Sequence, residues 1–95
     1  MRRQTRTIER FEAEIVVQNQ LGIHARPAAA FVRRAREFAC EMEIDKGGEI
    51  FAAKSILAVL SAALDQGTAF ILRARGPDAK AAVARMQELV ASFRD

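Results

Sequence analysis

The chain lacks several residue types that mark particular classes of protein. Its 95 residues include no Trp, no Tyr, one His and one Cys. A lone cysteine excludes an internal disulfide, and the alternating stretch around Cys40 favours a small buried hydrophobe over a reactive thiol. One His and one Cys also provide too few ligands for a zinc site and no second base for a catalytic triad. We therefore expect neither a metal nor a cofactor.

Long apolar runs are missing as well. No stretch approaches the length of a membrane span, and no signal-peptide pattern is found, so we expect no membrane insertion and a cytoplasmic location. The length suits one domain with a single modest core that needs no disulfide or metal.

Charge is distributed unevenly along the chain. The net charge of +3 arises within residues 1–10, which contain four arginines and one acidic residue, Glu9. The remaining sequence has eleven basic and eleven acidic residues. We predict a basic, flexible N-terminal extension over residues 1–10 and a domain over residues 11–95. A neutral body without Tyr or Trp disfavours an RNA-binding module, which stays open as an alternative, and we expect no nucleic-acid partner.

Hydrophobic periodicity predicts the elements of the first half. Apolar and polar residues alternate over 11–17, which is typical of a strand with one covered face. Six apolar residues then follow helical spacing: Ala28, Phe31, Val32, Ala35, Phe38 and Ala39. Alternation returns at residues 40–45, and a Gly47-Gly48 turn leads into residues 50–52, which indicates a hairpin.

The second half predicts two more helices around a strand. Ser55 is a favoured N-cap for a short helix that ends before Gly67. The apolar residues 69–72 suit an interior strand, and Pro77 at a first helical position predicts a helix from about Pro77 to Phe93. The order strand, helix, strand, strand, helix, strand, helix predicts an α+β sandwich with helices on one face of the sheet.

The segment around the single histidine is where chemistry is expected. His24 precedes a predicted helix, whose first N–H groups and positive dipole end favour an anion. Arg26 can add a bidentate clamp, and a neutral imidazole is nucleophilic near pH 7. We therefore hypothesise that His24 accepts a phosphoryl group. The alternative is a solvent-facing residue that merely begins a helix.

The stretch G-I-H-A-R-P-A-A, residues 22–29, resembles the active-site motif of HPr, the histidine phosphocarrier of the bacterial phosphoenolpyruvate-dependent phosphotransferase system. The resemblance begins near Phe11 and covers nearly everything after it. It implies an open-faced β-sandwich of order βαββαβα, in which three helices cover one face of a four-stranded antiparallel sheet. It also implies a monomer that is not an enzyme: His24, stabilised by Arg26, would take a phosphoryl group from phosphorylated Enzyme I and pass it to Enzyme II A components for sugar uptake.

Further residues take possible roles from the same resemblance. Ser55 is similar to the regulatory serine that HPr kinase/phosphorylase modifies in some bacteria, although it would cap a helix in any case. The helical spacing of Arg26, Arg33 and Arg36 predicts a basic strip, and a partner surface is expected from Arg33, Arg36, Ile56, Leu57 and Leu60. A regulatory carrier of the nitrogen branch remains an alternative function, because such a carrier would also keep His24 and Arg26.

Overall fold

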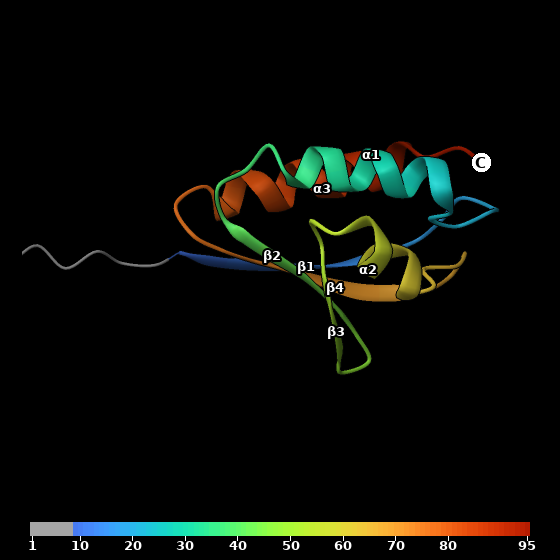
Figure 1. Cartoon of the computed structure of the whole chain (residues 1–95), viewed down its shortest axis with the longest axis horizontal. Coiled ribbons are helices and arrows are strands. Elements are labelled where there is room, and N and C mark those ends of the chain that lie inside the picture. The colour runs from blue at the N-terminus through green and yellow to red at the C-terminus, as the bar shows by residue number, and fades with distance from the viewer. Residues whose placement is uncertain (1–8) are drawn as a thin grey trace, which may run out of the picture.

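A computed structural model describes residues 9–95 of the chain. Most of the predicted basic extension, residues 1–8, lies outside these residues. Four strands and three helices follow in the order βαββαβα over the described part, which confirms the predicted fold (Figure 1). The elements are β1 (Arg10–Val16), α1 (Ala25–Ala35), β2 (Glu41–Lys46), β3 (Glu49–Ala52), α2 (Ile56–Ser61), β4 (Ala69–Arg75) and α3 (Ala79–Ser92).

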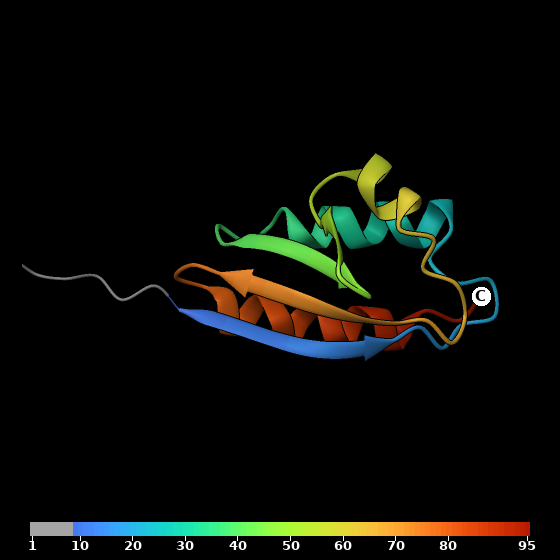
Figure 2. The ribbon, with the colours of Figure 1, turned by 90° about the horizontal axis from the view of Figure 1, so that it is seen from below.

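The strands form one antiparallel sheet in the order β1-β4-β2-β3. Figure 2 shows β1 and β4 running side by side along the length of the molecule, and Arg10 faces Arg75 in their register. The predicted interior strand is therefore β4, which pairs with β1 on one side and with β2 on the other. Because β4 lies between two strands, its buried Phe70 and Leu72 occupy the centre of the core.

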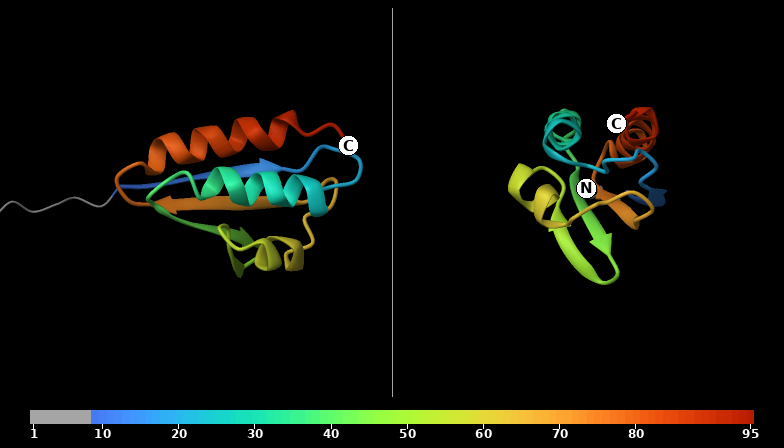
Figure 3. Two further views of the ribbon diagram at one scale, coloured as in Figure 1. Left: turned by 45° about the horizontal axis from the view of Figure 1, so that its top comes forward. Right: turned by 90° about the vertical axis from the view of Figure 1, so that its right-hand side faces the viewer.

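All three helices lie on the same side of the sheet (Figure 3). α3 packs on β1 and β4, and α1 packs between α2 and α3. Phe31 of α1 meets Phe70 of β4 edge to face, with ring centroids 6.4 Å apart, which joins the helical layer to the sheet. The opposite sheet face is open and charged, and Arg73 there contacts Glu12 at 2.9 Å and Asp45 at 3.2 Å.

Two helix boundaries differ from the predictions. α1 ends at Ala35, before Phe38 and Ala39 of its predicted apolar face. α3 begins at Ala79, two residues after the predicted start at about Pro77. The reason lies in Asp78, whose carboxylate accepts from the backbone N–H groups of Ala39 at 2.8 Å and of Cys40 at 2.9 Å. Asp78 thereby ties the start of α3 to the loop before β2.

We expect Asp78→Ala to destabilise the protein by about 1 kcal/mol at neutral pH, because two backbone donors lose a charged acceptor at a partly exposed position. The hydrogen bond from Ala39 is the main cause that lowers the pKa of Asp78 from 3.8. The contribution of a carboxyl with a depressed folded-state pKa is present above about pH 4 and disappears as the pH falls through that pKa. Urea unfolding from pH 7 to pH 2 should show the free energies of unfolding of the wild type and Asp78→Ala converging. The exposed-site control Glu14→Ala should show no such trend. A stability difference that stays constant over this range would contradict the assignment.

Candidate functional site

His24 occupies the N-cap of α1. Its backbone is extended, with φ −84° and ψ −164°, and its carbonyl accepts the first helical hydrogen bond from Ala28 at 2.8 Å. The His24 side chain makes no capping hydrogen bond. Within residues 9–95 the N–H groups of Ala25 and Arg26 have no acceptor, and Pro27 has no N–H. Two backbone donors at the positive end of α1 are therefore available to an anion next to His24.

The loop before His24 is pressed against the connection between α2 and β4. Gly22 has φ +69°, and a Cβ there would lie 2.7 Å from the Leu64 carbonyl oxygen and 2.8 Å from the Asp65 Cα. Ile23 is buried, and its N–H donates to the same Leu64 oxygen at 2.8 Å. Only glycine fits this conformation and this close approach. The contact fixes the backbone directly before His24.

The residues that follow α3 also contact the loop before His24. The N–H of Leu21 donates to the carbonyl oxygen of Asp95 at 2.8 Å. A pocket of about 310 Å³ lies beside the start of α1 and is lined by Arg26, Pro27, Ala30 and residues 92–95. His24 is thus placed by the β1–α1 loop, the α2–β4 loop and the residues after α3, which are distant from one another in sequence.

The two nitrogens of the His24 ring differ in environment. The side chain is partly exposed, but Nε2 is buried and has no hydrogen-bond partner. An incoming group is therefore sterically excluded from Nε2 in this structure. The sequence could not distinguish the two nitrogens, because their exposure depends on how the loop is folded.

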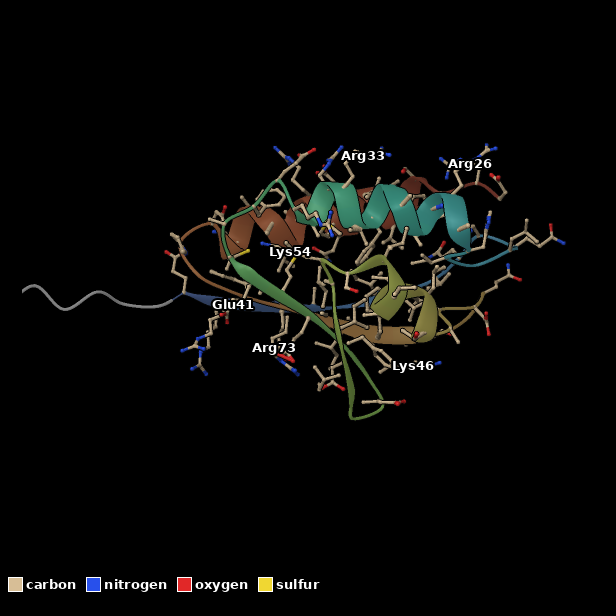
Figure 4. All side chains as sticks on the ribbon, viewed as in Figure 1. Arg26, Arg33, Glu41, Lys46, Lys54 and Arg73 are labelled. Carbon is tan, nitrogen blue, oxygen red and sulfur yellow. The ribbon has the colours of Figure 1, made fainter. Side chains whose placement is uncertain are left out.

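The predicted basic residues lie on and just after α1. Arg26 and Arg33 are exposed and project from the side of α1 that faces away from the sheet (Figure 4). Arg36 follows the last turn, and its Nε donates to the Lys54 carbonyl oxygen at 3.0 Å. Arg36 is therefore also an anchor for the segment that leads into α2, a contact that helical spacing did not predict.

Ser55 is the N-cap of α2, as predicted. Its backbone is extended, and its Oγ accepts from the Ala58 N–H at 3.2 Å. Lys46 holds the other end of α2, because its Nζ donates to the carbonyl oxygens of Ala62 at 2.8 Å and Ala63 at 3.2 Å. A helix of six residues is thus fixed at both termini by side chains.

α2 presents an apolar surface to solvent. Leu57 is 75% exposed, and Ile56 and Leu60 are also exposed, whereas Val59 points into the core. This agrees with the prediction that so short a helix cannot bury every side. Leu21, in the loop before His24, is another exposed large hydrophobic residue that the sequence analysis did not assign. Its only signal in the sequence is an apolar residue in a loop that otherwise has little periodicity.

Other features of the described chain lie away from His24. A cavity of about 490 Å³ is on the open face of the sheet, where it is lined by charged residues such as Arg73 and Glu43. The strand phenylalanines Phe11 and Phe51 face the buried Ala74 and Ile44 in register, so they stand on the helix side and offer no rings to RNA on the open face.

Residues 9–95 contain no helix that is long and apolar enough to cross a membrane. The same part of the chain contains no group of three or more His, Cys, Asp or Glu side chains that could hold a metal ion.

Comparison with known proteins gives a consistent result. The family described as "PTS HPr component phosphorylation site" matches residues 11–92. The chain is 38% identical over 79 residues to the phosphocarrier protein HPr of Haemophilus influenzae, which covers 83% of this chain and 91% of that protein. It is 34% identical over 79 residues to the HPr-like protein Crh of Bacillus subtilis, and the match covers 83% of this chain and 93% of that protein. The crystal structure of HPr-C-His from Thermoanaerobacter tengcongensis superposes with a TM-score of 0.83 at 35% identity. The superposition covers 86% of this chain and 92% of that chain. The chain therefore belongs to the HPr family of phosphocarrier proteins of the phosphotransferase system.

Proposed function

We propose that this protein receives a phosphoryl group on His24 from phosphorylated Enzyme I and passes it to Enzyme II A components for sugar uptake. It acts as a substrate of other proteins and not as an enzyme. The observation that carries the proposal is the position of His24, partly exposed at the start of α1 beside two unpaired backbone N–H groups and the exposed Arg26. Donors of this kind stabilise a phosphoryl group where it forms.

The transfer needs positioning and charge stabilisation more than acid–base chemistry. In the proposed step the lone pair of His24 Nδ1 attacks phosphorus, and the N–P bond of the phosphohistidine on Enzyme I breaks. The electron pair of that bond stays on the donor nitrogen. In this proposal the N–H groups of Ala25 and Arg26 and the Arg26 guanidinium receive the phosphoryl oxygens.

The proposal is tested by incubating the protein with phosphoenolpyruvate and Enzyme I and following its mass. Gain of one phosphate that is lost in acid is the expected result for a phosphohistidine. Enzyme I of the sugar branch and of the nitrogen branch should be compared, because preferential transfer from the latter would favour the alternative of a regulatory carrier. Similarity to HPr-like Crh supports keeping that alternative. No phosphate gain with either enzyme would refute the proposal.

We further propose that Ile56, Leu57 and Leu60, with Arg33 and Arg36, form the surface on which these partners dock. Exposed apolar side chains on α2 and arginines on the adjoining α1 support this, since α1 and α2 pack together. Leu57→Ala is expected to raise the KM for phosphorylated Enzyme I about tenfold while the unfolding midpoint stays unchanged, because Leu57 is mostly exposed. Ile50 is exposed on the open face, so Ile50→Ala is the matched control. Equal KM values for both variants would refute the proposed surface.

Ser55 is proposed as a regulatory site for HPr kinase/phosphorylase. Its hydroxyl lies at the start of α2, so a phosphate there would place negative charge beside the proposed docking surface. Treatment with this kinase and ATP should add an acid-stable phosphate that Ser55→Ala does not acquire, and the modified protein should accept phosphoryl groups from Enzyme I more slowly. A kinase-treated chain with unchanged mass would show that Ser55 serves only as a helix cap.

The expected monomer is also a proposal. The crystal structure of Bacillus subtilis Crh, at 32% identity and a TM-score of 0.70, is described as a dimer with a swapping domain. Light scattering of the full chain at the concentration used for the transfer assay distinguishes the two states directly.

A further inference from the structure

Two buried polar atoms in the β1–α1 loop have no partner. Within residues 9–95, Asn19 Oδ1 and His24 Nε2 are the only buried side-chain nitrogen or oxygen atoms without a hydrogen bond. An unsatisfied buried polar atom destabilises the folded state, so such atoms are rare in folded proteins. The two occur in one loop, and one of them belongs to the proposed phosphoryl acceptor. This coincidence indicates a functional relation between Asn19 and His24.

Asn19 is held firmly in place. Its side chain is buried, with 5% exposure, and its Nδ2 donates to the Gly22 carbonyl oxygen at 2.7 Å. The N–H of Gly22 donates in turn to the Asn19 carbonyl oxygen at 3.1 Å. Because the amide group is fixed by Nδ2, its Oδ1 is a preoriented acceptor that lies close to the backbone leading into His24.

The reaction at His24 needs such an acceptor. A neutral imidazole whose Nδ1 has a free lone pair carries its proton on Nε2. When the N–P bond forms at Nδ1, Nε2 keeps this proton and the ring gains positive charge. The Nε2–H group is therefore a hydrogen-bond donor before the transfer and a stronger one afterwards. An acceptor aimed at Nε2 favours both the reactive tautomer and the phosphorylated ring.

We propose that Asn19 is a positioning residue for phosphoryl transfer. Through Nδ2 it fixes the Gly22 backbone, and through Oδ1 it accepts the hydrogen bond from His24 Nε2–H. The two atoms are not bonded to each other in the structure described here, so the contact forms by rotation of the His24 side chain or through one bridging water. The proposal deepens the proposed function of His24 and rests on it.

Other charges near the loop stay constant when Asn19 is replaced. They are Arg26 on α1, Asp65 of the α2–β4 loop, and Arg94 and Asp95 after α3. A change in the tautomer of His24 in an Asn19 variant would therefore report the contact with Asn19. Loss of the acceptor in Asn19→Ala should shift the neutral ring toward the Nδ1–H tautomer. A carboxylate in Asn19→Asp should instead retain the Nε2–H tautomer, because it still offers an acceptor for the Nε2–H group.

The experiment has two arms. In the first, ¹⁵N NMR of the ring nitrogens of the full chain, without Enzyme I, gives the His24 tautomer ratio in the wild type, Asn19→Ala and Asn19→Asp. In the second, transfer from phosphorylated Enzyme I is measured, and Asn19→Ala is expected to lower kcat about tenfold with KM changed less than about twofold. Circular dichroism checks the fold of each variant, and Asn19→Asp, which preserves side-chain size, serves if Asn19→Ala does not fold.

The two arms separate this proposal from the proposed function. A wild-type tautomer ratio in Asn19→Ala, or loss of the Nε2–H tautomer in Asn19→Asp, would show that Asn19 supports only the loop backbone and would overturn the proposal. If the wild-type protein accepts no phosphoryl group, the function proposed for His24 fails. The NMR arm then still decides whether Asn19 controls the His24 ring.

Discussion

His24→Ala is expected to abolish the gain of acid-labile phosphate from Enzyme I. The variant keeps the two free backbone N–H groups and Arg26 but has no nitrogen that can attack phosphorus, so no partial activity should remain. His24 makes no side-chain hydrogen bond, and the unfolding midpoint should therefore change little. Mass spectrometry after incubation with phosphoenolpyruvate and Enzyme I measures the phosphate directly.

Arg26→Ala in the same assay separates the role of Arg26, which stabilises the phosphoryl group, from that of the nucleophile His24. This variant should still gain phosphate, but about 100-fold more slowly, because one cationic group around the transferred phosphoryl is lost. Arg85, exposed on α3 and distant in sequence from the site, provides the matched control for removal of one surface charge. Phosphate on His24→Ala, or an Arg26→Ala rate equal to that of Arg85→Ala, would contradict the assignment of the site.

Gly22→Ala is expected to have the largest effect of any single-methyl addition near the site. At φ +69° an alanine costs about 1 kcal/mol in backbone strain, and its Cβ would lie 2.7 Å from the Leu64 carbonyl oxygen. Since both colliding groups are backbone, the loop must move, and we expect a total loss of about 2–4 kcal/mol of stability. Displacement of the residues directly before His24 should also slow phosphoryl transfer at least tenfold.

Gly47→Ala isolates the effect of the contact. Gly47 has a similar φ of +59°, but a Cβ there would have nothing within 4 Å. This variant should lose only about 1 kcal/mol of stability, which is the cost of backbone strain at positive φ. Its transfer kinetics should be unchanged. Urea unfolding of both variants gives the comparison. Equal destabilisation of Gly22→Ala and Gly47→Ala would mean that the α2–β4 loop moves without cost and does not fix the loop before His24.

The sequence predicted the elements well because local rules govern them. Alternation predicted β1 and β2, a run of apolar residues predicted β4, and Gly47-Gly48 predicted the hairpin of β2 and β3. The N-cap preference of serine correctly predicted the start of α2 at Ser55. α3 begins two residues after the predicted start at about Pro77, because proline is acceptable in a turn as well as at a first helical position. Tertiary contact decided between the two, since Asp78 binds the backbone of Ala39 and Cys40.

The sequence by itself determined which group can carry chemistry: one histidine before a helix start, with Arg26 in the first turn. Residue type and helical spacing are properties of the chain, so they can be recognised without a fold. Only the tertiary structure decided which ring nitrogen is buried, that Gly22 is pressed against Leu64, and that Asn19 is buried beside the loop. Those features depend on segments distant in sequence that the sheet and helices bring together, because burial and close contact arise only when the core is packed.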